Sequence, residues 1–570
     1  MSPSTTPSSS THPSTIPSLL MRPRQTGGGG LSRPYHTTTT YGSYGYGGYS
    51  NGGGLGIFTD NDDSGNTAYS YDRRGSHRRR RRLMRHLTLL LGTVVVVYCV
   101  YFLFWAGPAS ASVSSTVPIT DSTTTTNSKS ESKPESDSAT TTAAKWTLKT
   151  PGDKTAESKG GKQHSPPPKE VLRNLSLTAE QCDAYFPGLT KEVDEVVKKG
   201  PFEVRQQTSG LGPLQGRIED GQIYILHAQR KSDISTEMLN SRTASLHQLH
   251  RALVTWPSTD PNDPIPDTIF TLNFQDQPFG TAWTYSRHAD PDFTARDSPN
   301  KRNFLMPHFS FWAWDLPFIG SMSRAARAID RLEGEYLGSR WRDKIPKAVW
   351  RGTTWFNSIS APGMRQKLVS AARGKPWADV EPLEWGNGGG NGNATNALAI
   401  EEFCRYKYVV HTEGVTYSGR FQFLQMCASV VLTPPILWMQ HVTHLVKPLF
   451  SNELDLGKDV KRWTPTPGTK RAWPVSYPPE EANIVFVAPD WSDLGDTVAW
   501  LEAHPEVAEG IARRQRELFV GGGYFSPAAE TCYWRALVRG WAKMARTEGQ
   551  GWEEVKGVPF ETFIFKNTLE

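Results

Sequence analysis

The chain has 570 residues, with 63 Lys and Arg against 57 Asp and Glu, a formal net charge of +6. Residues 1–86 hold 11 Arg, no Lys and 4 Asp, so the rest of the chain carries 52 basic and 53 acidic residues. Because the basic excess belongs to the N-terminal tail, the sequence does not predict a nucleic-acid partner for the folded part.

The N-terminal tail is not expected to fold by itself. Residues 1–70 consist largely of Ser, Thr, Pro, Gly and Tyr, which bury too little apolar surface to offset the loss of conformational entropy. We therefore expect residues 1–86 to be a disordered tail that ends in an Arg cluster between Arg73 and Arg85. A nuclear-localisation signal is the alternative interpretation of this cluster.

A twenty-residue segment, Leu87 to Ala106, contains no charged residue and predicts a transmembrane helix. At 1.5 Å per residue it would span about 30 Å, the thickness of the hydrocarbon core of a bilayer. The Arg cluster lies directly before it, and the next basic residue after it is Lys129. The positive-inside rule then places the tail in the cytosol and everything after Pro108 in the lumen. A cleaved signal peptide would lie nearer the N-terminus.

Residues 107–170 are rich in Ser, Thr, Pro and Lys, which is typical of a stalk. The remaining 400 or so residues are enough for two domains, expected at 171–345 and 346–570. Four cysteines outside the membrane segment, Cys182, Cys404, Cys427 and Cys532, allow three pairings in an oxidising lumen, and their spacing does not choose between them. Asn174 and Asn393 begin glycosylation sequons on the lumenal side.

Apolar runs bounded by turn residues alternate with helical patterns in the folded region, which predicts α/β layers. The expected strands are 268–274, 347–350, 408–412, 429–433 and 483–488. The expected helices are 395–405, 421–427, 492–519 and 530–548. Three segments rich in Gly, Pro, Asn or charge, namely 287–301, 384–396 and 454–480, are expected to be surface insertions.

The stretch from Tyr406 to Leu424 is the most informative part of the sequence. It predicts a strand, a loop with Gly414 and Gly419 that can approach a ligand closely, and a helix with Ser418 as N-cap. Arg420 would then lie in the first helical turn, beside free backbone N–H groups. That combination suits a diphosphate. An ordinary strand–helix turn with a solvated arginine is the alternative.

In open α/β sheets, ligands gather at the carboxyl ends of strands. Asp276 follows the strand at 268–274, the run Arg351 to Thr353 follows the strand at 347–350, and the 415–420 loop follows the strand at 408–412. A carboxylate facing an arginine-rich anion site is suited to activating a hydroxyl beside a phosphate leaving group. Asp276 could equally be a turn residue that bonds its own backbone.

Other motifs give weaker signals. Asp290 and Asp292 form an Asp-x-Asp pattern that can hold a divalent cation, but they lie in a polar segment with no preceding apolar strand. The pairs His247/His250 and His441/His444 place imidazoles three residues apart on expected helices without the Glu of a zinc-protease motif. Surface or packing roles explain these histidines better.

Taken together, these motifs resemble glycosyltransferase family 90, which includes fungal capsule xylosyltransferases and the Rumi-like protein O-glucosyltransferases. Six matching elements occur in the family's order over about residues 180–545. They are Asn273–Pro278, Met306–Trp312, Trp350–Thr353 with Arg365, Cys404–Tyr408, Gly414–Phe421 and Thr531–Trp534.

The resemblance implies a GT-B-like fold, with two Rossmann-like domains facing a cleft, and an inverting reaction that needs no metal ion or other cofactor. It assigns Asp276 as the catalytic base. The implied donor-binding residues are Thr353, Arg365, Val415, Thr416, Tyr417, Ser418, Gly419 and Arg420, with Arg351 beside them. The implied lining of the donor-sugar site is His308, Phe309, Phe311, Trp312 and Trp314, with His250 as a further contact.

The resemblance also implies the disulfides Cys404–Cys427 and Cys182–Cys532. Two features depart from the family pattern. Gln275 and Gln277 flank Asp276 where the family commonly has Arg and Tyr, and the loop around Ser358 to Gly363 is longer than in the glucosyltransferases.

The resulting hypothesis is a type II membrane glycosyltransferase of the Golgi, with the endoplasmic reticulum as the alternative compartment. It would move a sugar, xylose or glucose, from a UDP-sugar to a hydroxyl of a glycan or glycoprotein acceptor. The alternatives are a catalytically inactive, membrane-anchored protein that binds carbohydrate or nucleotide, and a glycoside hydrolase with paired carboxylates.

Overall fold

The computed structural model describes residues 165–207, 212–257, 263–293, 301–337, 341–356, 358–385 and 394–569. The predicted tail, membrane helix and stalk, and the sequon at Asn393, lie outside these residues. The described residues all belong to one compact unit of the chain. Among them, the structure contains no helix with the length and apolarity to cross a membrane.

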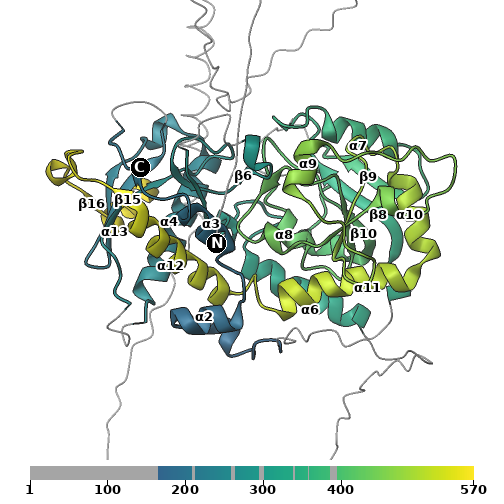
Figure 1. The fold of residues 1–570 in the computed structure, drawn as a ribbon, viewed down its shortest axis with the longest axis horizontal. Helices are drawn as coiled ribbons and strands as arrows, with labels where there is room; N and C mark the ends of the chain where they lie inside the picture. Colours follow the sequence, from purple (N-terminus) through teal and green to yellow (C-terminus); the bar gives the residue numbers. More distant parts are fainter. Residues whose placement is uncertain are drawn as a thin grey trace, which may run out of the picture. The chain divides into compact units, whose positions relative to one another are not determined.

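The second half of the chain forms a parallel sheet, which Figure 1 shows on the right. Its strands pair in the order β13-β14-β11-β10-β8-β9, and every pairing is parallel. The bounds are β8 (Ile345–Gly352), β9 (Ala378–Pro382), β10 (Tyr406–Val410), β11 (Val430–Thr433), β13 (Pro448–Phe450) and β14 (Ile484–Phe486). The predicted strands 347–350, 408–412, 429–433 and 483–488 are thus present, with bounds that differ by a few residues.

Alternate residues of these strands enter two separate clusters, because successive side chains point to opposite faces of a sheet. Tyr408 and Leu432 pack with helices α7 (Met364–Ala372), α10 (Leu494–Ala503) and α11 (Pro505–Arg516). Val409 and Val431 face the cluster that includes residues of α6 (Met322–Leu337) and α8 (Phe421–Leu424). Both faces are therefore covered, as a parallel sheet requires.

The first half forms a mixed sheet in the order β16-β3-β2-β4-β5-β7. Strands β4, β5 and β7 are parallel to one another, whereas β16, β3, β2 and β4 pair antiparallel. Only part of this sheet therefore has the parallel arrangement of a Rossmann-like domain. The bounds are β2 (Leu214–Glu219), β3 (Gln222–His227), β4 (Thr268–Leu272), β5 (Ala282–Thr284), β7 (Asn303–Leu305) and β16 (Val558–Pro559).

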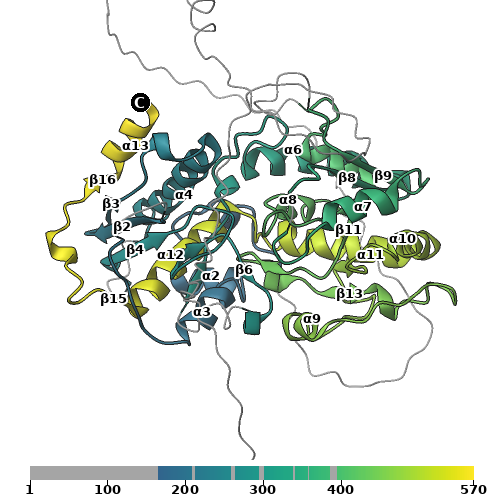
Figure 2. The ribbon, with the colours of Figure 1, turned by 90° about the horizontal axis from the view of Figure 1, so that it is seen from above.

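The C-terminal segment returns to the first half of the chain (Figure 2). Helix α12 (Pro527–Met544) begins at the N-cap Ser526, whose hydroxyl accepts a hydrogen bond from the Ala529 N–H, and packs against α4 (Thr236–Val254). Next, β15 (Ala545–Arg546) pairs with β1 (Phe202–Glu203), and α13 (Phe560–Leu569) follows β16. The strand β8 begins at Ile345, beside the expected boundary at 345/346, whereas α12, β15 and β16 contact elements of the first half.

The Cys182–Cys532 disulfide joins α2 (Ala179–Tyr185) to α12, and Cys404–Cys427 closes a second bridge. Both pairings implied by the family resemblance are confirmed. The remaining elements are short. They include α3 (Lys191–Val197), α9 (Pro467–Ala472), the pair β6 (Arg287–His288) and β12 (Trp438–Met439), the 3-10 segments Val171–Arg173, Lys231–Asp233, Phe309–Phe311, Trp341–Asp343, Ile400–Arg405, Thr443–Leu445, Ser451–Glu453 and Trp552–Glu554, and the π-helical turn Glu517–Gly521.

Three expectations on local structure need correction. The predicted helix 492–519 is divided into α10 and α11, because Pro505 lacks the N–H that would continue the first helix and begins the second. The predicted helix 395–405 is a 3-10 segment from Ile400 onward. The segment 454–480 is not confined to the surface, since it contains α9 and the buried Trp473.

Candidate functional site

The order of the parallel strands fixes where a ligand can bind. From β8 the chain passes through α7 to β9 on one side, whereas β10 pairs with the other side of β8. The direction of winding therefore reverses between β8 and β10, and the carboxyl ends of these two strands form a topological switch point. Thr353 follows β8, and the predicted donor loop follows β10.

The Arg365 side chain connects the ends of β8 and β10 through hydrogen bonds. Arg365 is the second residue of α7 and is 6% exposed. Its Nε donates to the Glu413 carbonyl oxygen at 2.9 Å, and its Nη1 donates to the Thr353 carbonyl oxygen at 3.0 Å. The loop turns sharply here, because the Gly414 N–H donates to the Tyr417 carbonyl oxygen at 3.0 Å and a Cβ at Gly414 would lie 2.9 Å from that oxygen.

Arg420 supplies a second guanidinium at the same place. Its Nη1 donates to the carbonyl oxygen of Arg351, and burial lowers its pKa to about 10, so it remains charged at neutral pH. His411, at the end of β10, has its pKa lowered to about 3 by burial and by the charges of Arg420 and Arg365. Two cations therefore flank a neutral imidazole, and each donates to a backbone carbonyl oxygen. This concentration of positive charge suits an anion.

Asp276 lies against the predicted donor loop. The Thr416 hydroxyl donates to the Asp276 carbonyl oxygen at 2.7 Å. More than a third of Asp276 remains accessible, yet the surrounding protein desolvates the carboxyl and raises its pKa, against the charge of Arg365, which lowers it. The charge of Arg365 acts on the Asp276 carboxyl, and the Thr416 hydrogen bond joins the Asp276 backbone to the loop. The structure thus brings together two groups that are far apart in the sequence.

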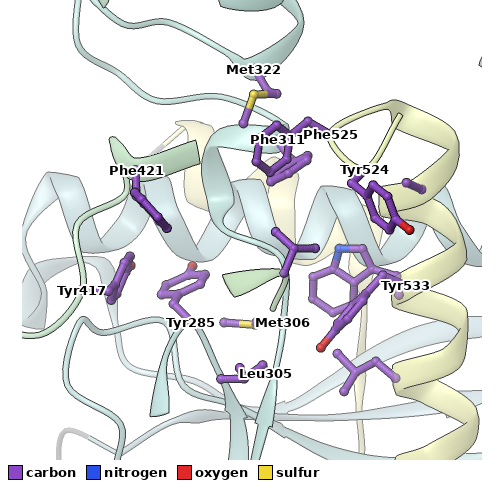
Figure 3. Packing of buried hydrophobic residues seen from close by; sticks show 14 of the residues in the cluster. Tyr285, Leu305, Met306, Phe311, Met322, Tyr417, Phe421, Tyr524, Phe525 and Tyr533 are labelled. Atoms are coloured by element: carbon purple, nitrogen blue, oxygen red, sulfur yellow. The ribbon is translucent and has the colours of Figure 1, made fainter. Parts of the chain in front are cut away.

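Two tyrosines lie near this carboxyl, and Figure 3 shows Tyr285 and Tyr417 next to each other within the packing of buried residues. The Tyr417 ring lies 6.1 Å from the Tyr285 ring and 5.5 Å from the His308 ring. The Tyr285 hydroxyl lies 2.7 Å from the Ser245 hydroxyl, whereas the buried Tyr417 hydroxyl has no hydrogen-bond partner among the described residues. Burial and the Asp276 charge raise the pKa of both tyrosines, so both stay protonated.

The position of the His308 ring explains why residue 419 is a glycine. A Cβ at Gly419 would lie 2.5 Å from the Cε1 and Nε2 atoms of His308, so only glycine fits at this position of the loop. The Nδ1 of His308 accepts from the Ser310 N–H at 3.2 Å, and burial lowers the pKa of the ring well below its usual value. The ring is therefore a neutral, fixed part of the wall behind the loop.

The other residues expected to line the donor sugar lie in different places. Trp314, like Phe309, stays near His308, with ring centroids 5.2 and 3.9 Å away. In contrast, Phe311 packs in the core against His441 and Phe525. Trp312 is 40% exposed and stacks on His247, while His250 stacks on Phe560 of α13. Trp312 and His250 thus pack on the α4 side of the molecule.

Two details of the predicted anion site are wrong. Arg420, not Ser418, occupies the N-cap position of α8, and this helix has only four residues, so it contributes little dipole. The Arg351 side chain is engaged by β9, with ion pairs to Asp379 at 2.7 Å and Glu381 at 3.3 Å. The two arginines Arg365 and Arg420 are the remaining cations of the site that the sequence assigned.

Glu413 is a buried acid that sequence reasoning did not assign. Its Oε1 accepts from the N–H groups of Leu437 at 2.8 Å and Trp438 at 2.7 Å. Its Oε2 has no partner among the described residues, and burial raises its pKa to about 8. Glu413 lies between Thr412 and Gly414 in the loop after β10, where no periodic pattern marks it, so the sequence alone offered no reason to single it out.

The acidic side chains that could suggest a metal site have partners within the protein. Asp290 and Asp292 both form ion pairs with Arg471, at 2.7 and 2.9 Å, which accounts for these carboxylates without a metal ion. Glu333, Cys404 and Cys427 lie close enough to hold a metal ion, but the cysteines form a disulfide and Lys344 binds Glu333 at 2.9 Å. Neither group fits a metal site.

Residues 181–451 match Glycosyl transferase family 90. The chain is 25% identical over 291 residues to an O-glucosyltransferase rumi homolog of Anopheles gambiae, a match that covers 50% of this chain and 63% of the relative. It is 21% identical over 305 residues to Protein O-glucosyltransferase 1 of Bos taurus, covering 51% and 67%. It is 22% identical over 292 residues to O-glucosyltransferase rumi of Drosophila melanogaster, covering 50% and 62%. The chain thus spans about two thirds or less of the length of these relatives. Residues 181–451 are thus similar to glycosyl transferase family 90, and the chain has distant homology to the Rumi and protein O-glucosyltransferases.

Proposed function

We propose that this protein is a glycosyltransferase that moves a sugar from a UDP-sugar to a hydroxyl group of a glycan or protein acceptor. The proposal rests mainly on one contact, the hydrogen bond between Thr416 and Asp276, which joins Asp276 to the Val415–Arg420 loop. This loop lies at the switch point of a parallel sheet, beside Arg365 and Arg420. A base and a diphosphate-binding site within one crevice are the two parts that an inverting transfer needs.

In the proposed reaction, Asp276 accepts a proton from the acceptor hydroxyl, whose oxygen attacks the anomeric carbon on the face opposite the UDP. The bond from the anomeric carbon to the diphosphate oxygen breaks, and negative charge develops on the departing UDP. Burial raises the pKa of Asp276 and makes it a stronger base than a solvated aspartate, while Arg365 keeps it from being neutralised.

Arg365 and Arg420 stabilise the charge that develops on the diphosphate. Charge stabilisation of this kind in a desolvated site is typically worth about 3 kcal/mol per donor. Because two fixed guanidiniums supply this charge, the proposed reaction does not depend on a metal ion. The Tyr417 hydroxyl, which has no hydrogen-bond partner in the described part of the chain, adds a neutral donor at the same site.

Xylose and glucose are the donor sugars we propose. The relatives are named O-glucosyltransferases, which favours glucose. The glutamines beside Asp276 and the longer loop between Thr353 and Arg365 differ from the family pattern, so the acceptor need not be that of the relatives.

We further propose a type II membrane protein of the Golgi, or alternatively of the endoplasmic reticulum, with the described residues in the lumen. The two disulfides support an oxidising compartment. The uncharged segment from Leu87 to Ala106 and the preceding Arg cluster support the orientation.

The second candidate function is a catalytically inactive protein that binds nucleotide or carbohydrate, favoured only by Gln275 and Gln277 beside Asp276.

Purified full-length protein in detergent can be incubated with radiolabelled UDP-xylose, UDP-glucose, UDP-galactose and GDP-mannose. The transferase proposal predicts sugar release or transfer from a UDP-sugar, abolished by Asp276→Asn. UDP binding without turnover of any donor would support the inactive alternative instead.

A further inference from the structure

A second pocket, of about 520 Å³, shares no lining residue with the candidate donor site. It lies beside α3, β6 and α9, which Figure 2 shows near one another. Its volume is within the range of sites for small organic ligands.

The pocket is lined by both charged and apolar side chains. The charged residues are Lys191, Glu192, Glu195, Lys199, Arg287 and Arg471. The apolar and aromatic residues are Val196, Ala289, Pro291, Met439, Val446, Pro448, Ala472, Trp473, Pro474, Val475 and Tyr477. A pyranose ring likewise combines hydroxyl groups around its edge with C–H groups on its faces.

The charges of the pocket are largely neutralised within the protein. Glu192 is 1% exposed and accepts from the Nε and Nη2 atoms of Arg287 at 2.7 and 2.9 Å. Lys191 pairs with Glu195 at 2.6 Å, and Arg471 pairs with Asp290. A neutral, hydroxyl-rich ligand therefore suits the pocket better than a multiply charged anion does.

His444 gives the second, independent sign of a ligand. Its side chain is 5% exposed, and its Nε2 lies 2.8 Å from the Gly188 carbonyl oxygen, which can only accept, so Nε2 carries the proton. Nδ1 is then an acceptor. It has no hydrogen-bond partner among the described residues and lies 3.8 Å from the Glu192 Oε1, another acceptor.

The Nδ1 atom of His444 is therefore a buried acceptor that lacks a donor among the described residues, whereas the Glu192 Oε1 already accepts from Arg287. Burial keeps His444 neutral, because it lowers the pKa of the imidazole. A hydroxyl group of a ligand can donate to this nitrogen.

We propose that this pocket binds a neutral pyranose unit of a carbohydrate, separately from the sugar-nucleotide. A sugar hydroxyl would donate to the His444 Nδ1, and an apolar face of the ring would pack on Val475 and Tyr477. The site goes beyond the proposed transfer reaction, because it would hold a glycan by a unit that does not react.

The test uses saturation-transfer NMR on full-length protein in a detergent without sugar head groups. The probes are the methyl glycosides of glucose, xylose, galactose and mannose, each with and without saturating UDP. We expect at least one glycoside to bind and to remain bound when UDP is present.

Two pairs of variants, each with a matched control, locate the binding. Val475→Trp fills the pocket at a residue that is 49% exposed, so folding should be retained, and it should weaken the glycoside by at least tenfold. Val254→Trp, at a residue of α4 that is 62% exposed and outside the pocket, is the matched control and should bind as the wild type does. Lys199→Ala should also weaken binding, whereas Lys198→Ala should not.

The proposal is overturned if none of the four glycosides binds, if UDP displaces the bound glycoside, or if Val475→Trp binds as well as the control. Inorganic phosphate that competes with the glycoside would also overturn it, because it would identify an anion site. Failure of the transferase proposal would look different, since it would abolish turnover of UDP-sugar while leaving glycoside binding intact.

Discussion

Replacing Glu413 by Gln should change how the stability of the protein depends on pH. Glutamine keeps the shape of the side chain and the oxygen that accepts from the N–H groups of Leu437 and Trp438, but cannot ionise. In the wild type, burial raises the pKa of Glu413 from 4.5 to about 8. A change of this size corresponds to about 5 kcal/mol between the protonated and the ionised limits.

The sign of the effect follows from proton uptake. Between pH 4.5 and 8 the folded state keeps the Glu413 proton and the unfolded state has lost it, so the free energy of unfolding falls as pH rises. The wild type should therefore lose about 1.4 kcal/mol per pH unit relative to Glu413→Gln, or close to 3 kcal/mol from pH 5.5 to 7.5.

The measurement is urea unfolding of both proteins, followed by tryptophan fluorescence at several pH values. The difference between the two proteins is the informative quantity, because other buried groups such as His411 and Glu530 titrate equally in both. Exposed Glu554 supplies the control, since Glu554→Gln removes one negative charge without touching the buried site. The free energies of unfolding of the wild type and of Glu413→Gln are compared at each pH. If their difference stays constant from pH 5.5 to 7.5, Glu413 does not hold its proton in the folded state.

Three further predictions concern the crevice and its surroundings. Arg420→Ala should weaken the affinity for UDP by at least tenfold in isothermal titration, and an unchanged dissociation constant would exclude Arg420 from the diphosphate site. Arg365→Gln removes the charge that lowers the pKa of Asp276, so the acid limb of the pH profile of UDP-sugar turnover should move to higher pH; a shift to lower pH would contradict the coupling. Replacing Cys404 and Cys427 together by Ala opens a loop with a sequence separation of 23 and should cost about 3 kcal/mol of unfolding free energy, measured by urea unfolding at one pH. An unchanged midpoint would show that the bridge adds no stability.

Much of the parallel sheet could be predicted from the sequence, because its strands are continuous apolar runs that end at Pro, Gly or polar residues. The run at 429–433 ends at Pro434, and β11 stops at Thr433. Strands buried on both faces give this strong local signal. The carboxyl ends of such strands lie at one edge of the sheet, which is why the positions of Thr353 and the 415–420 loop could be anticipated.

The return of the C-terminal segment to the first half could not be anticipated. It depends on β15 and β16, which have two residues each and pair with partners more than 300 residues away. No local pattern specifies such pairings. The separation of Trp312 from His308, only four residues away, likewise depends on packing against α4 rather than on the motif that contains both.

The contact between Asp276 and the donor loop was inferred from the order of motifs and from family resemblance, and the structure places the two together. Tyr285 and Glu413 were missed for opposite reasons. Tyr285 has no motif around it, whereas Glu413 lies within the most informative stretch but resembles an ordinary loop acid. Burial, which the sequence of a loop does not reveal, is what gives each its unusual pKa.

We propose that Asp276 acts as the base at a site where Arg365 and Arg420 hold the diphosphate. Comparison of Asp276→Asn with the wild type tests this role in two assays on the same preparation, sugar release from the active UDP-sugar and equilibrium binding of UDP. We expect turnover to fall by about 10²- to 10⁴-fold while the affinity for UDP stays nearly the same. Turnover of the variant at a near-normal rate would show that Asp276 is not the base.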